Sequence, residues 1–421
     1  MQKLIIEGGY PLTGTIRISG AKNAVLKLMA AALLGKGKFV IRDVPAIKDV
    51  YTMIGVLTAL GVKAELTDSV LTLEVDQITG EAPTDLVQEM RASIQVMGPL
   101  LARLGWVKIA KPGGCAIGDR PIDLHLRNLE RLGAVIEEEH GFITARCSRL
   151  IGQEISLDFP SVGATENLMM AATLAKGKTV IYNAAREPEI VDIQNFLNQM
   201  GAKIYGAGTS VIVIEGIDEK HLGGAEYTVI PDRIEAGTYL LAAAITRGNI
   251  TLENVNPQHI QVLLSKLTET NSRLSIGLNK ITLESGRIIQ PANIITLPYP
   301  GFATDLQPQF MSLVTLANGS SVIKETVYSR RFGHVEELRR MGADIQLDTN
   351  SAIVRGVKQL SGAAVRAMDL RAGAALVIAG LAAHGTTEIT GVEHIMRGYE
   401  RLVEKLQGVG AKINLVSEEG N

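Results

Sequence analysis

Cys115 lies in a stretch whose composition favours an open loop. Between Pro112 and Pro121 the chain holds three glycines and two prolines, which disfavour a regular helix or strand. Lys111 and Arg120 flank the cysteine in the sequence, and nearby cations lower the pKa of a thiol. These residue types predict a reactive thiol on a functional loop. The alternative is a small, half-buried cysteine in a turn, because free cysteines are usually packing residues.

A second group of chemically capable residues stands where apolar segments begin. The cations among them are Lys22, Arg91, Arg233 and Arg371, and the acids are Asp232, Asp305 and Asp369. Acids at a helix start are ordinary N-caps, and Asp232 with Glu235 predicts a capping box. Cations there face the positive end of the helix dipole, at a cost of up to about 1 kcal/mol each. Because helix N-termini also bind anions, converging starts would form a basic pocket. The alternative is that each cation reaches solvent or pairs with a nearby acid.

The elements that must position these residues recur along the chain. A helix-like stretch ends in a glycine turn and leads into alternating strand residues at Gly61, Gly133, Gly201, Gly342 and Gly410. The intervals are about 70 residues, except for one of two periods whose missing glycine falls near Asn271. The sequence therefore predicts six repeats of about 70 residues, one of them with a degraded turn.

A second helix in each repeat is apolar on every side. The six examples are 24–34, 93–103, 168–175, 239–246, 310–317 and 376–383. A helix that is hydrophobic all round is buried, whereas an amphipathic helix such as 191–197 covers a surface. Six buried helices do not fit one small core. We therefore expect an α/β chain of two closely joined domains, each of three repeats with helices inside and sheets outside, dividing near 227–230.

Composition limits the classes of function. The formal charge is −2 and the pI about 6.4, which argue against nucleic-acid binding. Cys115 and Cys147 are the only cysteines, and the seven histidines show no metal-binding spacing, so no metal is expected. The longest apolar run, 372–383, is too short to span a membrane, and the N-terminus has no signal-peptide pattern. We expect a cytoplasmic protein without membrane insertion; the sequence carries no indication of its oligomeric state.

Several motifs together resemble the UDP-N-acetylglucosamine 1-carboxyvinyltransferases, a branch of the enolpyruvyl transferase family. They are the Cys115 loop, Ser19-Gly20-Ala21-Lys22-Asn23, Ser161-Val162-Gly163-Ala164-Thr165, Asp369-Leu370-Arg371 and Arg397-Gly398-Tyr399-Glu400. The resemblance implies a two-domain inside-out α/β barrel of six repeats, which close over a cleft. It places one domain at 22–229 and the other at 1–21 with 230–421. It also implies transfer of the enolpyruvyl group of phosphoenolpyruvate to the 3-hydroxyl of UDP-N-acetylglucosamine with release of phosphate, the first committed step of peptidoglycan precursor synthesis. No cofactor is implied.

The resemblance also assigns roles to individual residues. Cys115 would protonate C3 of phosphoenolpyruvate, would add to it covalently and would be alkylated by fosfomycin, while Asp305 would take the proton of the sugar hydroxyl. The residues expected to hold the phosphate and carboxylate of phosphoenolpyruvate are Lys22, Arg120 and Arg397. A wider basic cleft would include Lys48, Arg91 and Arg371, with Asp369 in support. From the residues alone, Asp232, Asp305 and Asp369 are equal candidates for the base, and each could simply cap a helix.

For the nucleotide sugar, the resemblance points to residues that begin two helices and one turn. They are Asn23, Arg120, Pro121, Ile122, Asp123, Leu124, Ser161, Val162, Gly163 and Val327. Two positions depart from the family pattern. Asp158-Phe159-Pro160 stands where some members carry a lysine, and Met396 stands where an aspartate is common.

Two other functions compete with this interpretation. The related 3-phosphoshikimate 1-carboxyvinyltransferases perform the same transfer on a different hydroxyl, although the long Cys115 loop argues against that acceptor. A non-catalytic repeat protein that binds nucleotide sugars is the other. Such a protein has no need to retain Lys22, Cys115, Asp305 and Arg397 together. We also expect the Cys115 loop to become ordered as the cleft closes on the nucleotide sugar.

Overall fold

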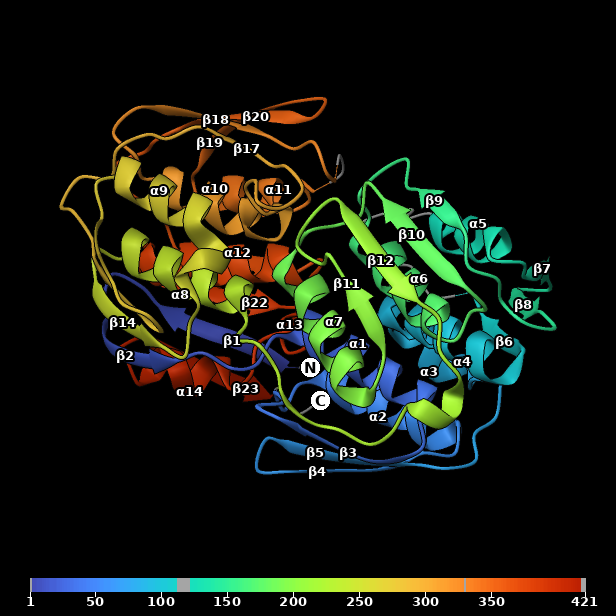
Figure 1. The fold of residues 1–421 in the computed structure, drawn as a ribbon. Coiled ribbons are helices and arrows are strands. Elements are labelled where there is room, and N and C mark those ends of the chain that lie inside the picture. The colour runs from blue at the N-terminus through green and yellow to red at the C-terminus, as the bar shows by residue number, and fades with distance from the viewer. Residues whose placement is uncertain (1, 112–121, 329–330, 418–421) are drawn as a thin grey trace. The chain divides into compact units, whose positions relative to one another are not determined.

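The computed structural model describes residues 2–111, 122–328 and 331–417, and these form two compact units (Figure 1). One unit comprises 20–230 and is here called the inserted unit. The other comprises 1–19 and 231–421 and is called the split unit. The described residues form six separate sheets, three in each unit.

A single repeat shows how each sheet is built. The strand β9 (Glu154–Ser156) leads into the buried helix α6 (Val162–Thr173) and then into β10 (Lys178–Tyr182), which pairs with β9 in parallel. The outer helix α7 (Pro188–Met200) follows, and the hairpin β11–β12 (Lys203–Tyr205, Val211–Glu215) completes the sheet in the order β11-β12-β10-β9. Parallel strands need such a crossover helix, whereas the last two strands need only a tight turn.

The same order of elements recurs in both units. The rest of the inserted unit consists of α1 (Lys22–Ala31), η1 (Ala32–Leu34), β3 (Gly37–Arg42), α2 (Lys48–Ala59), β4 (Lys63–Thr67), β5 (Val70–Val75), α3 (Thr84–Glu89), η2 (Arg91–Val96), α4 (Met97–Leu104), β6 (Trp106–Ala110), α5 (Asp123–Arg131), β7 (Val135–Glu139), β8 (Phe142–Arg146), η3 (Glu219–His221) and β13 (Glu226–Thr228).

The split unit contains the remaining elements. They are β1 (Gln2–Glu7), β2 (Thr13–Arg17), α8 (Arg233–Ile245), β14 (Asn249–Glu253), η4 (Pro257–Ile260), α9 (Gln261–Glu269), β15 (Arg273–Ile276), β16 (Lys280–Glu284), β17 (Ile294–Ile295), η5 (Thr304–Leu306), α10 (Gln307–Val314), β18 (Ser320–Lys324), α11 (Val335–Arg340), β19 (Asp344–Asp348), β20 (Ser351–Arg355), β21 (Ala364–Arg366), α12 (Leu370–Ala382), β22 (Thr386–Thr390), α13 (Val392–Ile395), α14 (Leu402–Gln407) and β23 (Lys412–Ser417).

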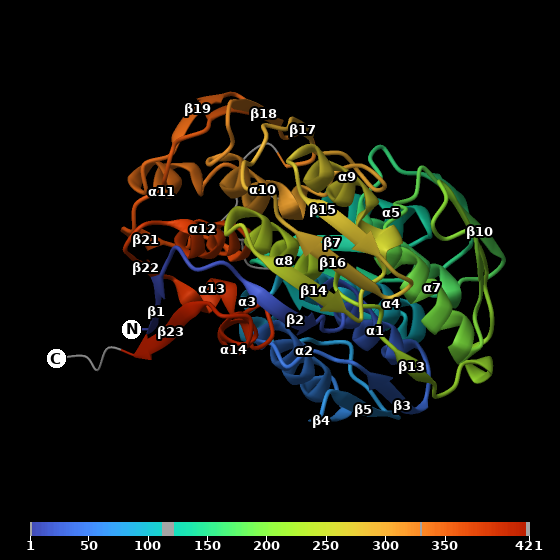
Figure 2. The same cartoon turned by 90° about the vertical axis from the view of Figure 1, so that its left-hand side faces the viewer.

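The N-terminal strands complete the split unit. Strand β1 lies between β22 and β23 and pairs antiparallel with both, so the first and last strands of the chain are neighbours (Figure 2). Strand β2 pairs in parallel with β14. The strand β13, at the end of the inserted unit, likewise pairs in parallel with β3 at its start. Each unit is thus closed by strands that are distant in the sequence.

The predicted buried helices form the centre of each unit. Helices α8, α10 and α12 pack on one another, and every residue of α10 is buried (Figure 1). In the inserted unit α4 packs on α6 and on η1, the continuation of α1, while both α4 and α6 contact η2. The amphipathic segment 191–197 lies within α7, as predicted. The arrangement of helices inside and sheets outside is confirmed. Among the described residues no helix is both long and apolar enough to cross a membrane.

The repeat with the degraded turn is structurally intact. Helix α9 ends at Glu269, and Asn271 has φ of +76°, in the left-handed region that the glycines adopt in the other repeats. Gly201, for example, has φ of +116° after α7. Asparagine is the residue other than glycine that most readily takes this conformation. The turn therefore survives the loss of its glycine.

Candidate functional site

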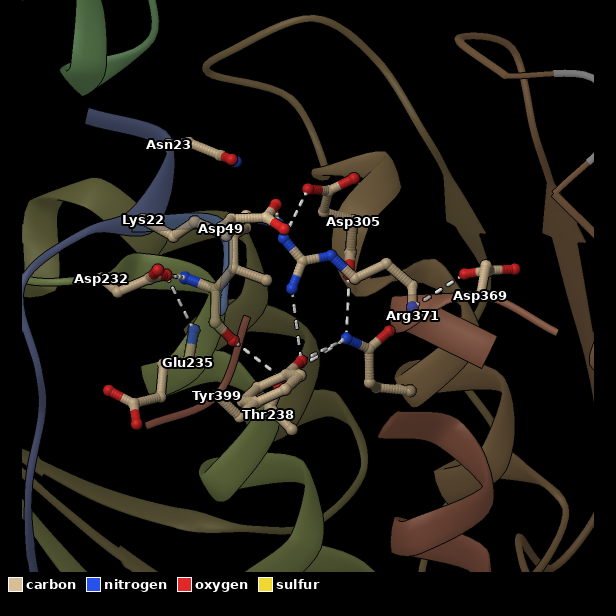
Figure 3. A network of polar contacts seen from close by, with 12 residues as sticks. Lys22, Asn23, Asp49, Asp232, Glu235, Thr238, Asp305, Asp369, Arg371 and Tyr399 are labelled. Atoms are coloured by element: carbon tan, nitrogen blue, oxygen red, sulfur yellow. Dashed lines mark hydrogen bonds and ion pairs between the residues drawn. The ribbon is translucent and has the colours of Figure 1, made fainter. Parts of the chain in front are cut away.

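The carboxylate of Asp305 lies between two guanidinium groups of the split unit. Asp305 is in η5, directly before α10, and Arg371 is the second residue of α12 (Figure 3). Arg371 Nη2 lies 2.8 Å from Asp305 Oδ2, and Arg331 Nη1 donates to Asp305 Oδ1. Both arginine side chains are nearly buried, while a quarter of the Asp305 side chain is exposed. Charge-assisted bonds of this kind hold a carboxylate in its ionised form.

Arg371 also joins a network of buried hydroxyl and amide groups (Figure 3). Its Nη1 donates to the hydroxyl of Tyr399 over 3.4 Å, and that hydroxyl lies 2.9 Å from Thr238 Oγ1. Gln309 Nε2 donates to the backbone carbonyl of Asp305 over 2.9 Å. Burial alone would lower the pKa of Arg371, but the neighbouring Asp305 carboxylate raises it above its ordinary value. The guanidinium is therefore permanently charged and held in one place.

The structure separates the three candidate acids. Asp232 caps α8 by accepting from the backbone N–H groups of Ile234 and Glu235, and Asp369 caps α12 in the same way. At η5 the cap position is taken by Ala303, so Asp305 has no such structural duty there. Asp305 is instead bound by two arginines.

The predicted capping box at α8 is only half formed. Glu235 accepts from the backbone N–H of Ser19 over 2.8 Å and from Lys405 Nζ over 2.6 Å, whereas the N–H of Asp232 donates to the Ser19 carbonyl. The prediction of a reciprocal box is therefore wrong. Lys405 and the backbone N–H of Ser19, both distant from Glu235 in the sequence, bind its carboxylate instead. Burial raises the pKa of Glu235 to about 7.

In the inserted unit, the cation at the start of α1 is paired with an acid. Lys22 Nζ lies 2.8 Å from Asp49 Oδ2, and the Asp49 side chain is almost fully buried at the start of α2. Lys48, its neighbour, is exposed. Asn23 is the second residue of α1, and its backbone carbonyl accepts from Lys27 Nζ over 2.6 Å. Lys22 and Arg371 thus each stand at a helix start and also pair with an acid.

The start of α6 has the geometry of an anion site. Ser161 is its N-cap and accepts from the N–H of Ala164 over 3.4 Å, so Val162 and Gly163 form the first turn. A side chain at Gly163 would meet Gln95 and His125 at about 3.2 Å, which explains the glycine. Backbone N–H groups in the first turn of a helix have no partner within the helix and favour negative charge.

Other predicted residues begin neighbouring segments. Asp123 and Leu124 open α5 after Ile122, and Arg91 opens η2. Of the residues that depart from the family pattern, Asp158 forms an ion pair with Arg127 at 2.8 Å, and Arg127 also contacts Asp123 at 3.2 Å. In the split unit, Val327 lies in the turn after β18, and Arg397 follows α13. Cys115, Arg120 and Pro121 lie outside the described residues.

Two functional candidates were missed by the sequence reasoning. Arg331 opens no helix, so the pattern of cations at helix starts could not find it, although it contacts Asp305 directly. Asp49 does stand at a helix start, but its importance comes from its ion pair with Lys22 at the start of α1, which only the structure reveals.

Comparisons with known proteins place the chain in a family. The family model described as EPSP synthase (3-phosphoshikimate 1-carboxyvinyltransferase) matches residues 6–406. UDP-N-acetylglucosamine 1-carboxyvinyltransferase 2 of Carboxydothermus hydrogenoformans is 55% identical, covering 99% of this chain and 100% of the relative. UDP-N-acetylglucosamine 1-carboxyvinyltransferase of Thermotoga maritima is 50% identical, covering 100% of both.

Solved structures show the same fold. The enolpyruvyl transferase NikO from Streptomyces tendae superposes with a TM-score of 0.90 at 25% identity, covering 99% of each chain. EPSP synthase from Acinetobacter baumannii has a TM-score of 0.78 at 19% identity, covering 99% of this chain and 100% of the other, which shows the fold alone. The expected enolpyruvyl transferase fold is confirmed. On the full-length identity of 50–55% to its relatives, the chain belongs to the UDP-N-acetylglucosamine 1-carboxyvinyltransferases.

Proposed function

We propose that this protein transfers the enolpyruvyl group of phosphoenolpyruvate to the 3-hydroxyl of UDP-N-acetylglucosamine and releases phosphate. The observation that carries the proposal is the Asp305 carboxylate held by Arg331 and Arg371. It supplies a positioned, ionised base in a chain whose full-length relatives bear that enzyme name.

Both substrates are polyanions, and cations placed at helix starts suit them. Lys22, Arg120 and Arg397 hold the phosphate and carboxylate of phosphoenolpyruvate in this proposal, and Lys48, Arg91 and Arg371 extend the basic surface. The Asp49–Lys22 pair supports the assignment, because a buried carboxylate fixes the direction of the ammonium group. Bidentate guanidinium groups recognise carboxylate and phosphate oxygens especially well.

The reaction needs one acid and one base. The sugar hydroxyl adds to C2 of phosphoenolpyruvate while C3 gains a proton, and loss of a C3 proton together with phosphate restores the double bond. Asp305 takes the hydroxyl proton, Cys115 delivers the proton to C3, and Cys115 is also the residue that fosfomycin alkylates. The two guanidinium groups support the role of Asp305, since a base must be ionised before it accepts a proton.

The nucleotide sugar is held by the starts of α5 and α6. The backbone N–H groups of Val162 and Gly163 lie at the N-terminus of α6, where negative charge is favoured. In this proposal they bind the diphosphate. Asn23, Ile122, Asp123, Leu124 and Val327 provide the remaining contacts, with Arg120 and Pro121. Asp369 contributes by capping α12 and thereby fixing Arg371.

The cellular role follows from the product. The enolpyruvyl nucleotide sugar is the first committed precursor of peptidoglycan, so the enzyme serves cell-wall synthesis, cell shape and division. Its substrates are phosphorylated and do not cross lipid unaided, which supports a cytoplasmic site of action. The two domains are assigned to 22–229 and to 1–21 with 230–421, close to the division of the two compact units.

Phosphate release with alternative acceptors tests the proposal. The protein is mixed with phosphoenolpyruvate and either UDP-N-acetylglucosamine or 3-phosphoshikimate, and phosphate and product mass are measured. We expect turnover only with the nucleotide sugar. Turnover with 3-phosphoshikimate alone would favour the acceptor named in the matching family model. Binding of the nucleotide sugar without phosphate release would favour a non-catalytic protein.

A further inference from the structure

Glu325 is fully buried at the end of β18 and accepts four hydrogen bonds. Its Oε1 accepts from the hydroxyl of Thr296 at 2.7 Å and from the backbone N–H groups of Val327 at 2.9 Å and Tyr328 at 2.7 Å. Its Oε2 accepts from the hydroxyl of Thr304 at 3.0 Å. Two hydroxyls and two backbone groups therefore meet on one carboxylate.

Stability alone does not account for this residue. Burying a carboxylate is costly unless donors satisfy it, and an apolar side chain of similar volume is often as stabilising as a buried ionic group. The hydroxyls of Thr296 and Thr304 tie Glu325 to two other segments, and the N–H groups of Val327 and Tyr328 fix the turn that follows it. Four hydrogen bonds converge on this one side chain, so these segments are held firmly.

Two chains of contacts lead from Glu325 to the carboxylate of Asp305. The first runs through Thr304, which directly precedes Asp305 in η5. The second runs through Tyr328, whose ring lies 5.3 Å from the guanidinium of Arg331, which in turn bonds to Asp305. A side branch fixes the backbone of Val327, a residue assigned to the nucleotide sugar.

We propose that Glu325 is a positioning residue of the enolpyruvyl transfer: its four hydrogen bonds fix the start of η5 and the turn after β18, and thereby set where Asp305, Arg331 and Val327 stand. The inference rests on the proposed function, because it takes Asp305 as the base. A misplacement of about 1 Å at a reacting group can lower the rate by about 10²-fold.

Two substitutions of Glu325 separate position from charge. In Glu325→Gln the amide oxygen can accept the three bonds of Oε1, and the amide nitrogen can donate to Thr304 in place of Oε2. Glu325→Asp keeps the charge but is one methylene shorter. We expect kcat of Glu325→Gln to stay within about threefold of the parent and kcat of Glu325→Asp to fall about tenfold or more. The opposite order would overturn the proposal.

A matched pair of threonines, one at the start of η5 and one directly after α10, gives the second test. Thr304→Val removes the hydroxyl that bonds to Glu325, whereas Thr315→Val removes one that donates to the Ser312 carbonyl over 2.7 Å. We expect Thr304→Val to lower kcat about tenfold with KM changed less than about twofold, and Thr315→Val to lower only the thermal midpoint. Equal kcat values would overturn the positioning role. Absence of transfer by the unmodified protein would instead overturn the proposed function.

Discussion

Two acidic side chains, one from each unit, are treated in opposite ways. In the split unit, Asp305 is a quarter exposed and bonded to two guanidinium groups. In the inserted unit, Glu166 of α6 is fully buried, with Lys27 Nζ at 3.5 Å and Gln95 Nε2 at 3.3 Å as its partners. Burial outweighs the attraction of Lys27 and raises the pKa of Glu166 to about 8.

Asp192 of α7 resembles Glu166 in this respect. It accepts from the hydroxyl of Tyr227 over 2.7 Å, yet burial raises its pKa to about 7. At neutral pH Glu166 is mostly protonated, and Asp192 is close to half protonated. The difference teaches that Glu166 and Asp192 are neutralised by burial, whereas two arginines converge on Asp305. A nearby opposite charge favours the ionised form of a carboxylate, which the proposed base requires.

The comparison between the two units is tested most strongly by removing one buried arginine from each of them. Arg331 and Arg103 are equally buried, but Arg103 Nη1 bonds to the carbonyls of Leu33 and Gly35, whereas Arg331 bonds to Asp305, the proposed base. We expect Arg331→Met to lower kcat about 10²-fold, because Asp305 loses one of the groups that orient it. Steady-state phosphate release measures the change.

The control is Arg103→Met. It should leave kcat within about threefold and destabilise the inserted unit by about 1–3 kcal/mol, since buried carbonyls lose their donor. Equal losses of kcat in the two variants would mean that buried arginines act only through stability.

The pH dependence of stability tests the other half of the comparison, the buried acid Asp192 of the inserted unit. The pKa of Asp192 is raised in the folded state, so its stabilising contribution is complete below about pH 4 and is lost as the pH rises through about 7. Asp192→Asn has no such proton to lose. Relative to the parent, its free energy of unfolding should rise by about 3 kcal/mol between pH 5 and pH 8.

Urea unfolding at the two pH values provides the measurement. Asp76→Asn makes the same change at a surface position and serves as control, because the Asp76 side chain is 84% exposed. A parallel pH profile for Asp192→Asn and the parent would show that Asp192 is ionised in the folded protein.

Much of the fold could be predicted because the repeats carry local signals. Glycine turns and wholly apolar helices identified the six repeats, and Asn271 replaces a glycine without loss of the turn. The strand pairings that close each unit could not be predicted this way. Strand β1 pairs with β23 from the other end of the chain, and no local propensity encodes that partner.

The site could be predicted only where residues share a local pattern. Lys22, Asp305 and Arg371 stand at helix starts and are visible as such. Arg331 and Glu325 reach Asp305 and Thr304 through contacts across the fold and break no local rule. Glu235 shows the converse, because its local pattern predicts a capping box that distant partners displace. Tertiary contacts thus decide which partner each of these charged residues has.

One side-by-side assay tests the central claim, that the arginine-bound Asp305 is the base of the transfer. Phosphate release from phosphoenolpyruvate and UDP-N-acetylglucosamine is compared for Asp305→Asn and Asp192→Asn, which make the same chemical change in the two units. We expect kcat to fall at least about 10²-fold in Asp305→Asn and to stay within about threefold in Asp192→Asn. Retention of more than about a tenth of the activity by Asp305→Asn, or an equal loss in both variants, would contradict the account.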